Sequence, residues 1–327
     1  MADLYYIAEV GINHEGDFNT AIEYCRKAKE VGANAVKFQW VKADRAYEKG
    51  TESYKVFKNS YLSLDEMQKI NNFCEELSID FFATPGDMET LYDLAKINNK
   101  IVKISSGLAT HRYLIKEAAR LFKTLIVSTG TLFLDEIIEL NKFLSELKCD
   151  YIILKCTSEY PCQDQNLNLD SIPFLRELLK NNIGYSCHSL DSLPSCVAVS
   201  LGANVIEKHF SFDISRSGYD HSISFDVDQT KNLINKLRRI SQIKSWDGKL
   251  PAEVEKIKRN KMHRYMFPKR DLEKNYEINL KDFYFLRSDY IEKSKMISAC
   301  YSLEVEGKKL LHPCKSNTPL LKKHLEE

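Results

Sequence analysis

The feature of this sequence that most restricts its fold is a strict alternation of short apolar runs with longer segments of helical period. The runs are rich in β-branched or aromatic residues and predict eight strands: Tyr5–Ile12, Ala35–Trp40, Phe81–Thr84, Ile101–Ser105, Leu125–Ser128, Tyr151–Cys156, Ile183–Ser186 and Val205–His209. The segments between and after them are amphipathic and predict helices: Ala21–Val31, Leu64–Leu77, Met88–Ile97, Leu114–Leu121, Leu134–Leu147, Phe174–Leu179, Ser192–Leu201 and Thr230–Ile240. A helix between successive strands predicts parallel pairing, because each parallel connection needs a crossover.

An open doubly wound sheet and a closed (β/α)8 barrel both alternate in this way. Eight strand–helix units within residues 1–245 match the barrel in number and in size. The glycine pattern G-x-G-x-x-G of dinucleotide-binding sheets does not follow the first predicted strand. The sequence therefore predicts an α/β protein whose first domain, residues 1–245, is a (β/α)8 TIM barrel.

The sequence changes character after residue 245. Residues 246–262 are strongly charged and include Gly248 and Pro251, which is typical of a linker, with a helix expected over Ala252–Arg259. Residues 263–327 hold short mixed runs between turn signals such as Glu306-Gly307, so we expect a small, mostly β domain. A domain of that size has little core of its own, and we expect it to gain stability by docking onto another surface.

The composition of the chain excludes some classes of function. Its 47 Lys and Arg residues nearly balance its 46 Asp and Glu residues, so neither a nucleic-acid nor a membrane partner is indicated. The 9 cysteines are scattered and odd in number, which is typical of reduced thiols rather than of a disulfide framework. The first residues show no basic segment followed by a long apolar one, so we expect a cytoplasmic protein.

Polar and ionisable residues gather at the carboxyl ends of the predicted strands, where (β/α)8 barrels build their active sites. In chain order these ends supply Glu9, Lys37, Gln39, Thr84, Lys103, Ser106, Ser128, Ser158, Tyr160, Ser186, His188, Glu207 and His209. A barrel built only for stability has no use for them, because a buried ion without a partner is costly. We therefore predict a binding or catalytic site at this rim.

The last two predicted strands end in histidines. Side chains two positions apart on a strand share a face, so Ser186 lies with His188, and Glu207 lies with His209. The two strands are neighbours in a barrel, so the two imidazoles can converge at the rim. Two imidazoles beside a carboxylate suit a divalent transition metal whose other ligands are waters. Hydrogen-bonded rim histidines are an equally open interpretation of these residues alone.

Lysines and hydroxyls recur on successive strands and indicate an anionic ligand. Phosphate and carboxylate oxygens accept hydrogen bonds from cations and short donors, which Lys37, Lys103, Thr84, Ser106 and Ser128 would supply. A buried strand lysine also suits a Schiff-base aldolase, so that reaction stays open as an alternative. The accompanying hydroxyls and paired histidines favour a phosphorylated substrate.

Six segments of the chain, taken together, resemble the sialic acid synthase family of N-acetylneuraminate, legionaminic and pseudaminic acid synthases. The segments are Ala8–Gly16, Val36–Gln39, Lys103–Gly107, Ser128–Gly130, Cys156–Pro161 and Ile206–Phe210. They occur in the family's order between residues 5 and 226. The part of the chain from His263 onward resembles, less specifically, a shortened antifreeze-like (SAF, β-clip) domain.

The resemblance implies a particular reaction. Phosphoenolpyruvate would condense with an N-acylated amino-sugar aldehyde, such as N-acetylmannosamine or a 6-deoxy relative, to give a nine-carbon nonulosonic (sialic-type) acid. Inorganic phosphate would leave by C–O cleavage. His188 and His209 would hold Mn²⁺, Mg²⁺ or another divalent cation that polarises the aldehyde for attack by C3 of phosphoenolpyruvate. Members of the family form homodimers in which the small domain of one chain caps the barrel of the other.

The resemblance also implies a role for each site residue by its motif position. The expected catalytic residues are Glu9, Lys37, Lys103 and Glu207. The expected ligands of phosphate and carboxylate are Lys37, Lys103, Thr84, Ser106, Ser128, Ser158 and Ser186. The expected sugar contacts are Glu9, Gln39, Tyr160 and Asp220, with Arg287 reaching the N-acyl group.

The most consequential departure from the family pattern is Leu108. The family commonly has a carboxylate there, thought to manage the water or proton at the reacting carbon. Leucine does no acid–base chemistry, so Glu9, Glu207 or Glu159 must substitute, or the reaction is slow or altered. Two alternatives therefore stay open: a synthase with an atypical acceptor sugar, and a degenerate barrel that binds sugar or phosphate without turnover.

Two further departures concern neighbouring groups. Cys187 replaces the aspartate of the usual Ser-Asp-His, and alternation predicts that it points away from His188. Arg287 is not followed by the usual Pro-Gly-x-Gly turn. We expect acceptor specificity to depend on loop contacts such as those from Glu48–Asn59.

Overall fold

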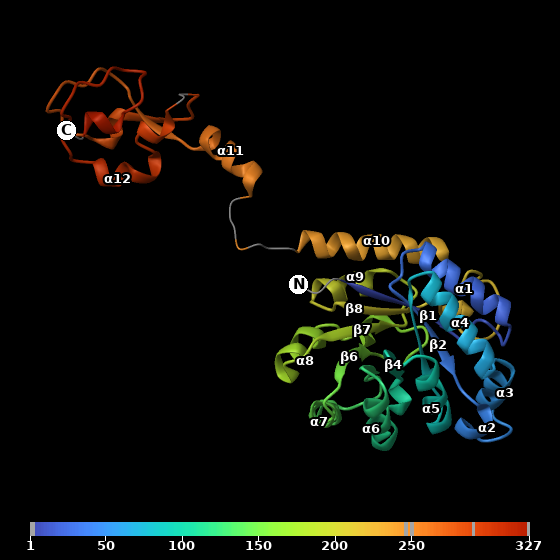
Figure 1. Cartoon of the computed structure of the whole chain (residues 1–327). Coiled ribbons are helices and arrows are strands. Elements are labelled where there is room, and N and C mark those ends of the chain that lie inside the picture. Colours follow the sequence, from blue (N-terminus) through green and yellow to red (C-terminus); the bar gives the residue numbers. More distant parts are fainter. Residues whose placement is uncertain (1–3, 245–247, 249–251, 290–291, 326–327) are drawn as a thin grey trace. The chain divides into compact units, whose positions relative to one another are not determined.

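The computed structural model describes residues 4–244, 248, 252–289 and 292–325, and the chain divides into two compact units (Figure 1). The first unit is Met1–Ser245 and the second is Trp246–Glu327. Residues 245–247 and 249–251 of the predicted linker, including Pro251, lie outside the described residues.

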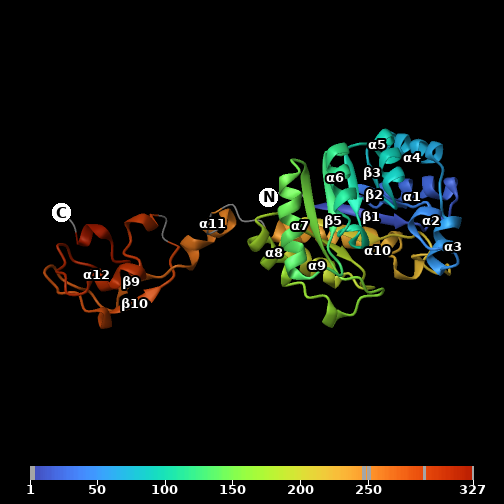
Figure 2. The ribbon, with the colours of Figure 1, turned by 90° about the horizontal axis from the view of Figure 1, so that it is seen from below.

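The first unit is built on eight strands, and each coincides with a strand predicted from the sequence. They are β1 (Tyr5–Gly11), β2 (Ala35–Trp40), β3 (Asp80–Pro85), β4 (Ile101–Ile104), β5 (Thr124–Ser128), β6 (Asp150–Cys156), β7 (Ile183–Cys187) and β8 (Val205–His209). They form one sheet in the order β3-β2-β1-β8-β7-β6-β5-β4, and contacts between β3 and β4 bring its two edges together. Helices surround the strands in both views, which confirms the predicted (β/α)8 barrel (Figures 1 and 2).

The eight predicted helices are all present, with ends that differ by a few residues. They are α1 (Phe18–Glu30), α4 (Leu64–Glu76), α5 (Met88–Ile97), α6 (Arg112–Leu121), α7 (Leu134–Glu146), α8 (Ser171–Leu179), α9 (Leu193–Ser200) and α10 (Val227–Ile243). Two short helices, α2 (Ala43–Ala46) and α3 (Glu52–Asn59), occupy a segment expected to be a loop. The side chain of Thr51 caps α3 by accepting from the N–H of Tyr54, but α3 is short and buries no residue.

Apolar side chains fill the barrel on both sides of the strands. Residues such as Tyr6, Val36 and Phe38 point outward and pack with the surrounding helices in one large cluster. A smaller cluster fills the interior near the amino ends of the strands: Ile7, Ala35, Phe82, Ile126, Leu154 and Val205. The carboxyl ends of the strands are thereby left for other side chains.

The second unit has its own small core. It begins with α11 (Glu253–Met262), close to the expected helix, and pairs β9 (Tyr265–Pro268) with β10 (Phe283–Leu286) in antiparallel fashion. Isolated bridges such as Leu272↔Cys314 and the short helix α12 (Ser302–Val305) complete it. None of the helices described in either unit is long and apolar enough to cross a membrane.

Gly184 in β7 offers a test of how tightly the interior is packed. A Cβ at this position would lie 2.4 Å from Leu154 Cδ2 and 2.7 Å from the backbone oxygen of Val205. We expect Gly184→Ala to lower the free energy of unfolding by about 1–3 kcal/mol, because neighbouring strands must shift. Gly107→Ala is the control, since a Cβ there would meet nothing within 4 Å. Equal urea midpoints for the two variants would contradict this expectation.

Candidate functional site

The interior of the barrel changes from apolar to ionic along its axis. On β1, inward-facing Ile7 is followed two residues later by Glu9, and on β8 Val205 is followed by Glu207 and then His209. A cavity of about 420 Å³ opens at this end of the strands. The ionisable side chains of the barrel interior therefore lie at the carboxyl ends of the strands, where the sequence predicted them.

Most of the predicted site residues line this barrel cavity together: Glu9, Lys37, Gln39, Thr84, Lys103, Ser106, Ser128, Ser158, Tyr160, Ser186, His188, Glu207 and His209. Asp220 lies beside the lining, with its Oδ2 3.6 Å from Nδ1 of His209. Arg287 belongs to the second unit, where it is exposed just after β10.

Three residues that line the cavity were not predicted from the sequence. Val41, Ala46 and Tyr47 border the cavity from β2 to the end of α2, whereas contacts were expected from Glu48–Asn59. Tyr47 stacks on Phe57 of α3 with ring centroids 5.0 Å apart, so α3 supports the wall behind it. The signal available in the sequence was this pair of aromatic residues within an otherwise polar segment.

Four buried charges form the floor of the cavity, and we call Glu9, Lys37, Lys103 and Glu207 the ionic quartet. Lys37 Nζ lies 3.1 Å from Glu9 Oε2 and 3.4 Å from Glu207 Oε1. Lys103 Nζ lies 3.6 Å from the same Glu207 oxygen. The quartet joins β1, β2, β4 and β8, and its formal charges cancel.

The two lysines of the quartet differ in their electrostatic surroundings. Burial alone would lower the pKa of Lys37, but Glu207 and Glu9 outweigh it and the pKa is raised. Burial lowers the pKa of Lys103, and Glu207 offsets this only in part because Lys37 repels the second ammonium. Burial works against the ionised form of Glu207, yet the two lysines hold its pKa below the usual range.

Short donors surround Lys103 on the side of β5. Its Nζ donates to Ser128 Oγ at 2.7 Å, and Ser106 Oγ accepts the backbone N–H of Gly130 at 2.9 Å. A Cβ on Gly130 would lie 2.2 Å from Ser158 Oγ and 2.7 Å from Ser106 Oγ, so only glycine lets these hydroxyls converge. An ammonium, hydroxyls and a close backbone suit phosphate or carboxylate oxygens.

The two histidines converge as alternation predicted, with ring centroids 5.6 Å apart. His188 Nδ1 donates to the backbone oxygen of Thr157 at 2.7 Å, which fixes the tautomer and gives Nε2 the lone pair. Burial, and then electrostatic repulsion by the neighbouring His209, lower the pKa of His188 to about 3, so the imidazole of His188 is neutral at pH 7. Tyr160 covers it, with ring centroids 4.1 Å apart.

The imidazole nitrogens of His188 and His209 fit a divalent cation that has few protein ligands. Nδ1 of His209 is buried without a hydrogen-bond partner, and His188 is already oriented by a backbone carbonyl, as metal-binding histidines usually are. No group of three or more His, Cys, Asp and Glu residues in the described part of the chain is placed to hold a metal. The pair therefore fits an ion that takes most of its ligands from water or a bound substrate.

Two of the departures from the family pattern, Leu108 and Cys187, lie in different places, and so does Glu159, a carboxylate considered as a substitute for the missing acid. Leu108 lines the barrel cavity. Cys187 packs in the outer apolar cluster, as alternation predicted for a residue pointing away from His188. Glu159 Oε2 accepts the backbone N–H of Gln163 at 3.1 Å and Asn166 Nδ2 at 2.9 Å, so this carboxylate caps its own loop. The structure thus narrows the candidates for acid–base chemistry to carboxylates of the quartet.

Comparison with known proteins agrees with this geometry. Residues 24–248 match the model of the NeuB family. The N,N'-diacetyllegionaminic acid synthase of Legionella pneumophila is 33% identical, over 98% of this chain and 94% of its own length.

Solved structures give the same answer. The N-acetylneuraminic acid synthetase of Leptospira borgpetersenii superposes with a TM-score of 0.75 at 31% identity, covering 80% of this chain and 92% of its own. The fold is shared with a spore coat polysaccharide biosynthesis protein E homologue from Chromobacterium violaceum, at a TM-score of 0.85 and 22% identity over 99% of this chain and 100% of its own. The chain therefore belongs to the NeuB family and is an enzyme of the sialic acid synthase type.

Proposed function

We propose that this protein condenses phosphoenolpyruvate with an N-acylated amino-sugar aldehyde, giving a nine-carbon nonulosonic acid and inorganic phosphate. The observation that carries the proposal is a single cavity holding the ionic quartet, a row of hydroxyls and two converging imidazoles. Membership of the NeuB family supports it, as does the name of the Legionella relative, which is a synthase of one such acid.

Phosphoenolpyruvate would bind at the β4–β5 side of the cavity. Lys103, Ser128 and Ser106 would contact its phosphate and carboxylate oxygens, with Thr84 and Ser186 on either side. The pKa of Lys103 is lowered by burial, and an anion beside it would raise that pKa and favour the ammonium form. The ammonium and the bound anion would stabilise each other in this way.

The acceptor sugar would lie above Gly11. A Cβ on this residue, whose φ is +58°, would come within 3.1 Å of Asp220 Oδ2 and 3.3 Å of both Gln39 Nε2 and Glu9 Oε1. The Gln39 amide donates to Glu9 Oε1 at 3.1 Å, so its orientation is fixed. Three polar side chains thus converge on one point, which suits the hydroxyls of a sugar.

The histidine pair would bring the acceptor's aldehyde to the reacting carbon. His188 and His209 would hold Mn²⁺, Mg²⁺ or another divalent cation, which when bound supplies Lewis-acid polarisation of the aldehyde. Tyr160, whose ring is tilted against His188, would cover the sugar from the mouth of the cavity. The site would then favour attack by C3 of phosphoenolpyruvate on the aldehyde carbon.

Proton transfer would fall to the carboxylates of the quartet. C3 of phosphoenolpyruvate forms the new bond to the aldehyde carbon, water adds to C2, and the C2–O bond breaks to release phosphate. The water's proton needs an acceptor, and Glu207 keeps a buried Oε2 without a hydrogen bond, whereas Oε2 of Glu9 lies beside the ammonium of Lys37. Glu207 is held as a carboxylate by the lysines, so we assign it, or Glu9, in place of the acid missing at Leu108.

The second unit would act from a partner chain. We propose a homodimer in which this SAF-like domain caps the other chain's barrel and presents Arg287 to the acceptor's N-acyl group. The exposed position of Arg287 just after β10 supports this role, because a guanidinium there keeps its donors available.

Turnover by the purified protein is the direct test. We expect phosphate release when it is incubated with phosphoenolpyruvate, Mn²⁺ and a panel of acylamino hexoses, and we expect a chelator to stop it. His209→Ala should lower the rate by about a hundredfold or more, because polarisation of the carbonyl is worth several kcal/mol. His312→Ala, at an exposed site in the second unit, is the control.

Other outcomes of the same assay favour the alternatives. Binding of phosphoenolpyruvate by calorimetry without phosphate release from any sugar would indicate a non-catalytic binder. Trapping of a lysine by borohydride in the presence of a keto acid, with no effect of chelator, would indicate a Schiff-base aldolase. If His209→Ala keeps metal-stimulated activity, His209 is not a ligand of the metal.

Leu108→Glu tests whether the missing acid limits the reaction. If proton transfer at the reacting carbon is rate-limiting, this change should raise kcat by about tenfold or more, the usual range for a positioned general acid or base. Leu108→Gln is the matched control, because the glutamine side chain has the shape of glutamate but does not titrate. An unchanged or lower kcat in Leu108→Glu would show that the site has been rebuilt around leucine.

Mixing two inactive variants tests the proposed exchange of domains. Lys103→Met should inactivate the barrel site of the chain that carries it. Arg287→Ala should inactivate the cap of the other chain. After co-refolding, about half of the dimers are hybrids with one intact site of two, so activity should recover to about a quarter of the parent value. No recovery in a mixture shown to contain hybrid dimers would mean that each cap serves its own barrel.

A further inference from the structure

The segment that carries Asp220 has an irregular backbone. We call residues 210–226, between β8 and α10, the Asp220 loop. Within it Gly218 has φ +84° and Tyr219 has φ +49°, and a non-glycine residue in the left-handed region is unfavourable. Such a conformation persists only where surrounding contacts enforce it.

Asn13, in the turn between β1 and α1, supplies the first of these contacts. Its Oδ1 accepts the backbone N–H of Asp220 at 2.9 Å, and its Nδ2 donates to Ser224 Oγ at 3.1 Å and to the backbone oxygen of Phe210 at 3.1 Å. Ser224 Oγ in turn donates to the backbone oxygen of Asp220 at 2.6 Å. One fully buried amide therefore fixes both ends of the loop and both backbone groups of Asp220.

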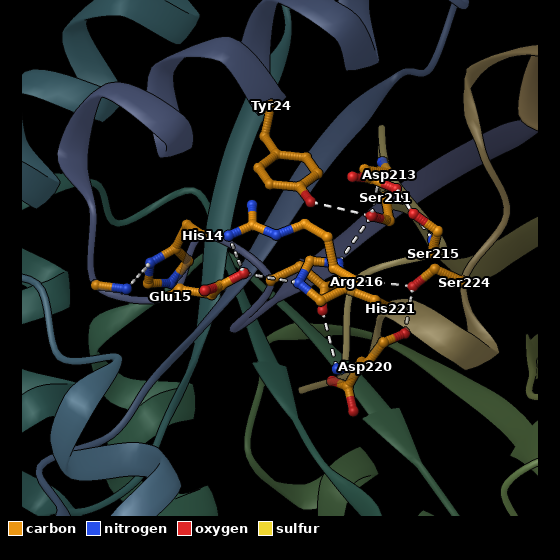
Figure 3. Close-up of polar contacts among 12 residues, drawn as sticks. His14, Glu15, Tyr24, Ser211, Asp213, Ser215, Arg216, Asp220, His221 and Ser224 are labelled. Atoms are coloured by element: carbon orange, nitrogen blue, oxygen red, sulfur yellow. Dashed lines mark hydrogen bonds and ion pairs between the residues drawn. The ribbon is translucent and has the colours of Figure 1, made fainter. Parts of the chain in front are cut away.

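A second set of contacts ties the same loop to the same turn through side chains (Figure 3). Glu15 Oε1 lies 3.0 Å from His221 Nε2 and 2.6 Å from Arg216 Nη2. The other ring nitrogen of His221 lies 2.9 Å from Ser211 Oγ, which also contacts the hydroxyl of Tyr24 at 3.2 Å. Glu15 itself has φ +56°, so the turn is held in a strained form as well.

The order Glu15–His221–Ser211 has the composition of a nucleophilic triad, but its surroundings exclude that function. Ser211 and His221 are 0% exposed, and neither lines the barrel cavity. Ser211 Oγ also accepts the backbone N–H of Asp213 at 3.1 Å, so its position is fixed by the loop. The network therefore acts on the backbone and has no access to a substrate.

We propose that Asn13, Glu15 and His221 are positioning residues that act through Asp220. They hold the Asp220 loop against the β1–α1 turn and so fix the Asp220 carboxylate beside Gly11 and His209, at the point assigned to the acceptor sugar. This inference rests on the proposed function for the role of Asp220. It adds that affinity for the acceptor, and not for phosphoenolpyruvate, is set by residues that touch neither substrate.

Steady-state kinetics of the full-length protein test this assignment, with N-acetylmannosamine or whichever sugar releases phosphate in the panel. We expect Asn13→Ala and Glu15→Gln to raise the acceptor KM by about tenfold or more, because small misplacements of a binding group are costly, while the KM for phosphoenolpyruvate stays within about twofold. Arg120→Met is the control, since it removes a comparable ion pair with Glu117 at 2.9 Å on α6, away from the cavity. Arg216→Met should raise the acceptor KM as Glu15→Gln does. It replaces Asn13→Ala in the test if that variant does not fold.

A double-mutant cycle with Asp220→Asn separates positioning from general stability. In the Asp220→Asn background, Glu15→Gln should change the acceptor KM by less than about twofold, because the group that it positions is already lost. The proposal would be overturned if the effects of Glu15→Gln and Asp220→Asn on the acceptor KM multiply. It would also be overturned if the KM for the acceptor and the KM for phosphoenolpyruvate rise equally. If the parent protein itself releases no phosphate with any sugar, the proposed function fails and this inference falls with it. An active parent with unaffected variants would overturn the inference alone.

Discussion

The polar half of the barrel depends on the pairing of two lysines with two glutamates inside the strands. Glu9, Lys37, Lys103 and Glu207 are between 2% and 5% exposed, and an isolated charge at that depth would be strongly unfavourable. Sharing Lys37 between two carboxylates joins β1, β2 and β8, and Lys103 extends the pairing to β4. Loss of one partner would leave an uncompensated buried charge, at a cost of about 3–5 kcal/mol. The same pairing that makes these ions tolerable therefore fixes the geometry of the site.

Much of this arrangement could be predicted from the sequence, because strands have a strict period of two. Alternation places Glu207 and His209 on one face, and the register of β7 with β8 sets Ser186 opposite Glu207. His188, two residues beyond Ser186, is then carried to within 5.6 Å of His209 between ring centroids. The same period sends Cys187 into the outer core.

Contacts without a period could not be predicted in this way. Asn13 and Asp220 are 207 positions apart, and their bond joins a side chain to a backbone group. Hydrogen bonds of this kind leave no repeating pattern in the sequence. The wall formed by Ala46 and Tyr47 was missed for a related reason, because it lies in a connection outside the strand–helix alternation and α3 behind it buries no residue. Loops thus supply the parts of the site that the barrel pattern does not determine.

Leu108 and Cys187 lie on different sides of the barrel wall and have different consequences. Cys187 stands opposite Lys208, which is fully buried, donates to the backbone oxygen of Ser189 and lies 4.3 Å from the ring centroid of Phe225. Burial lowers the pKa of Lys208, and the neighbouring Cys187 acts in the opposite direction. Because Cys187 packs in the outer cluster, its effect falls there and not in the cavity. Leu108 lines the cavity, and its effect falls on the chemistry. A buried ion pair is often no more stable than well-packed apolar side chains of similar volume, so stability alone does not account for the quartet. The presence of four ions beside the hydroxyls of Ser106 and Ser128 therefore favours a site that binds anions.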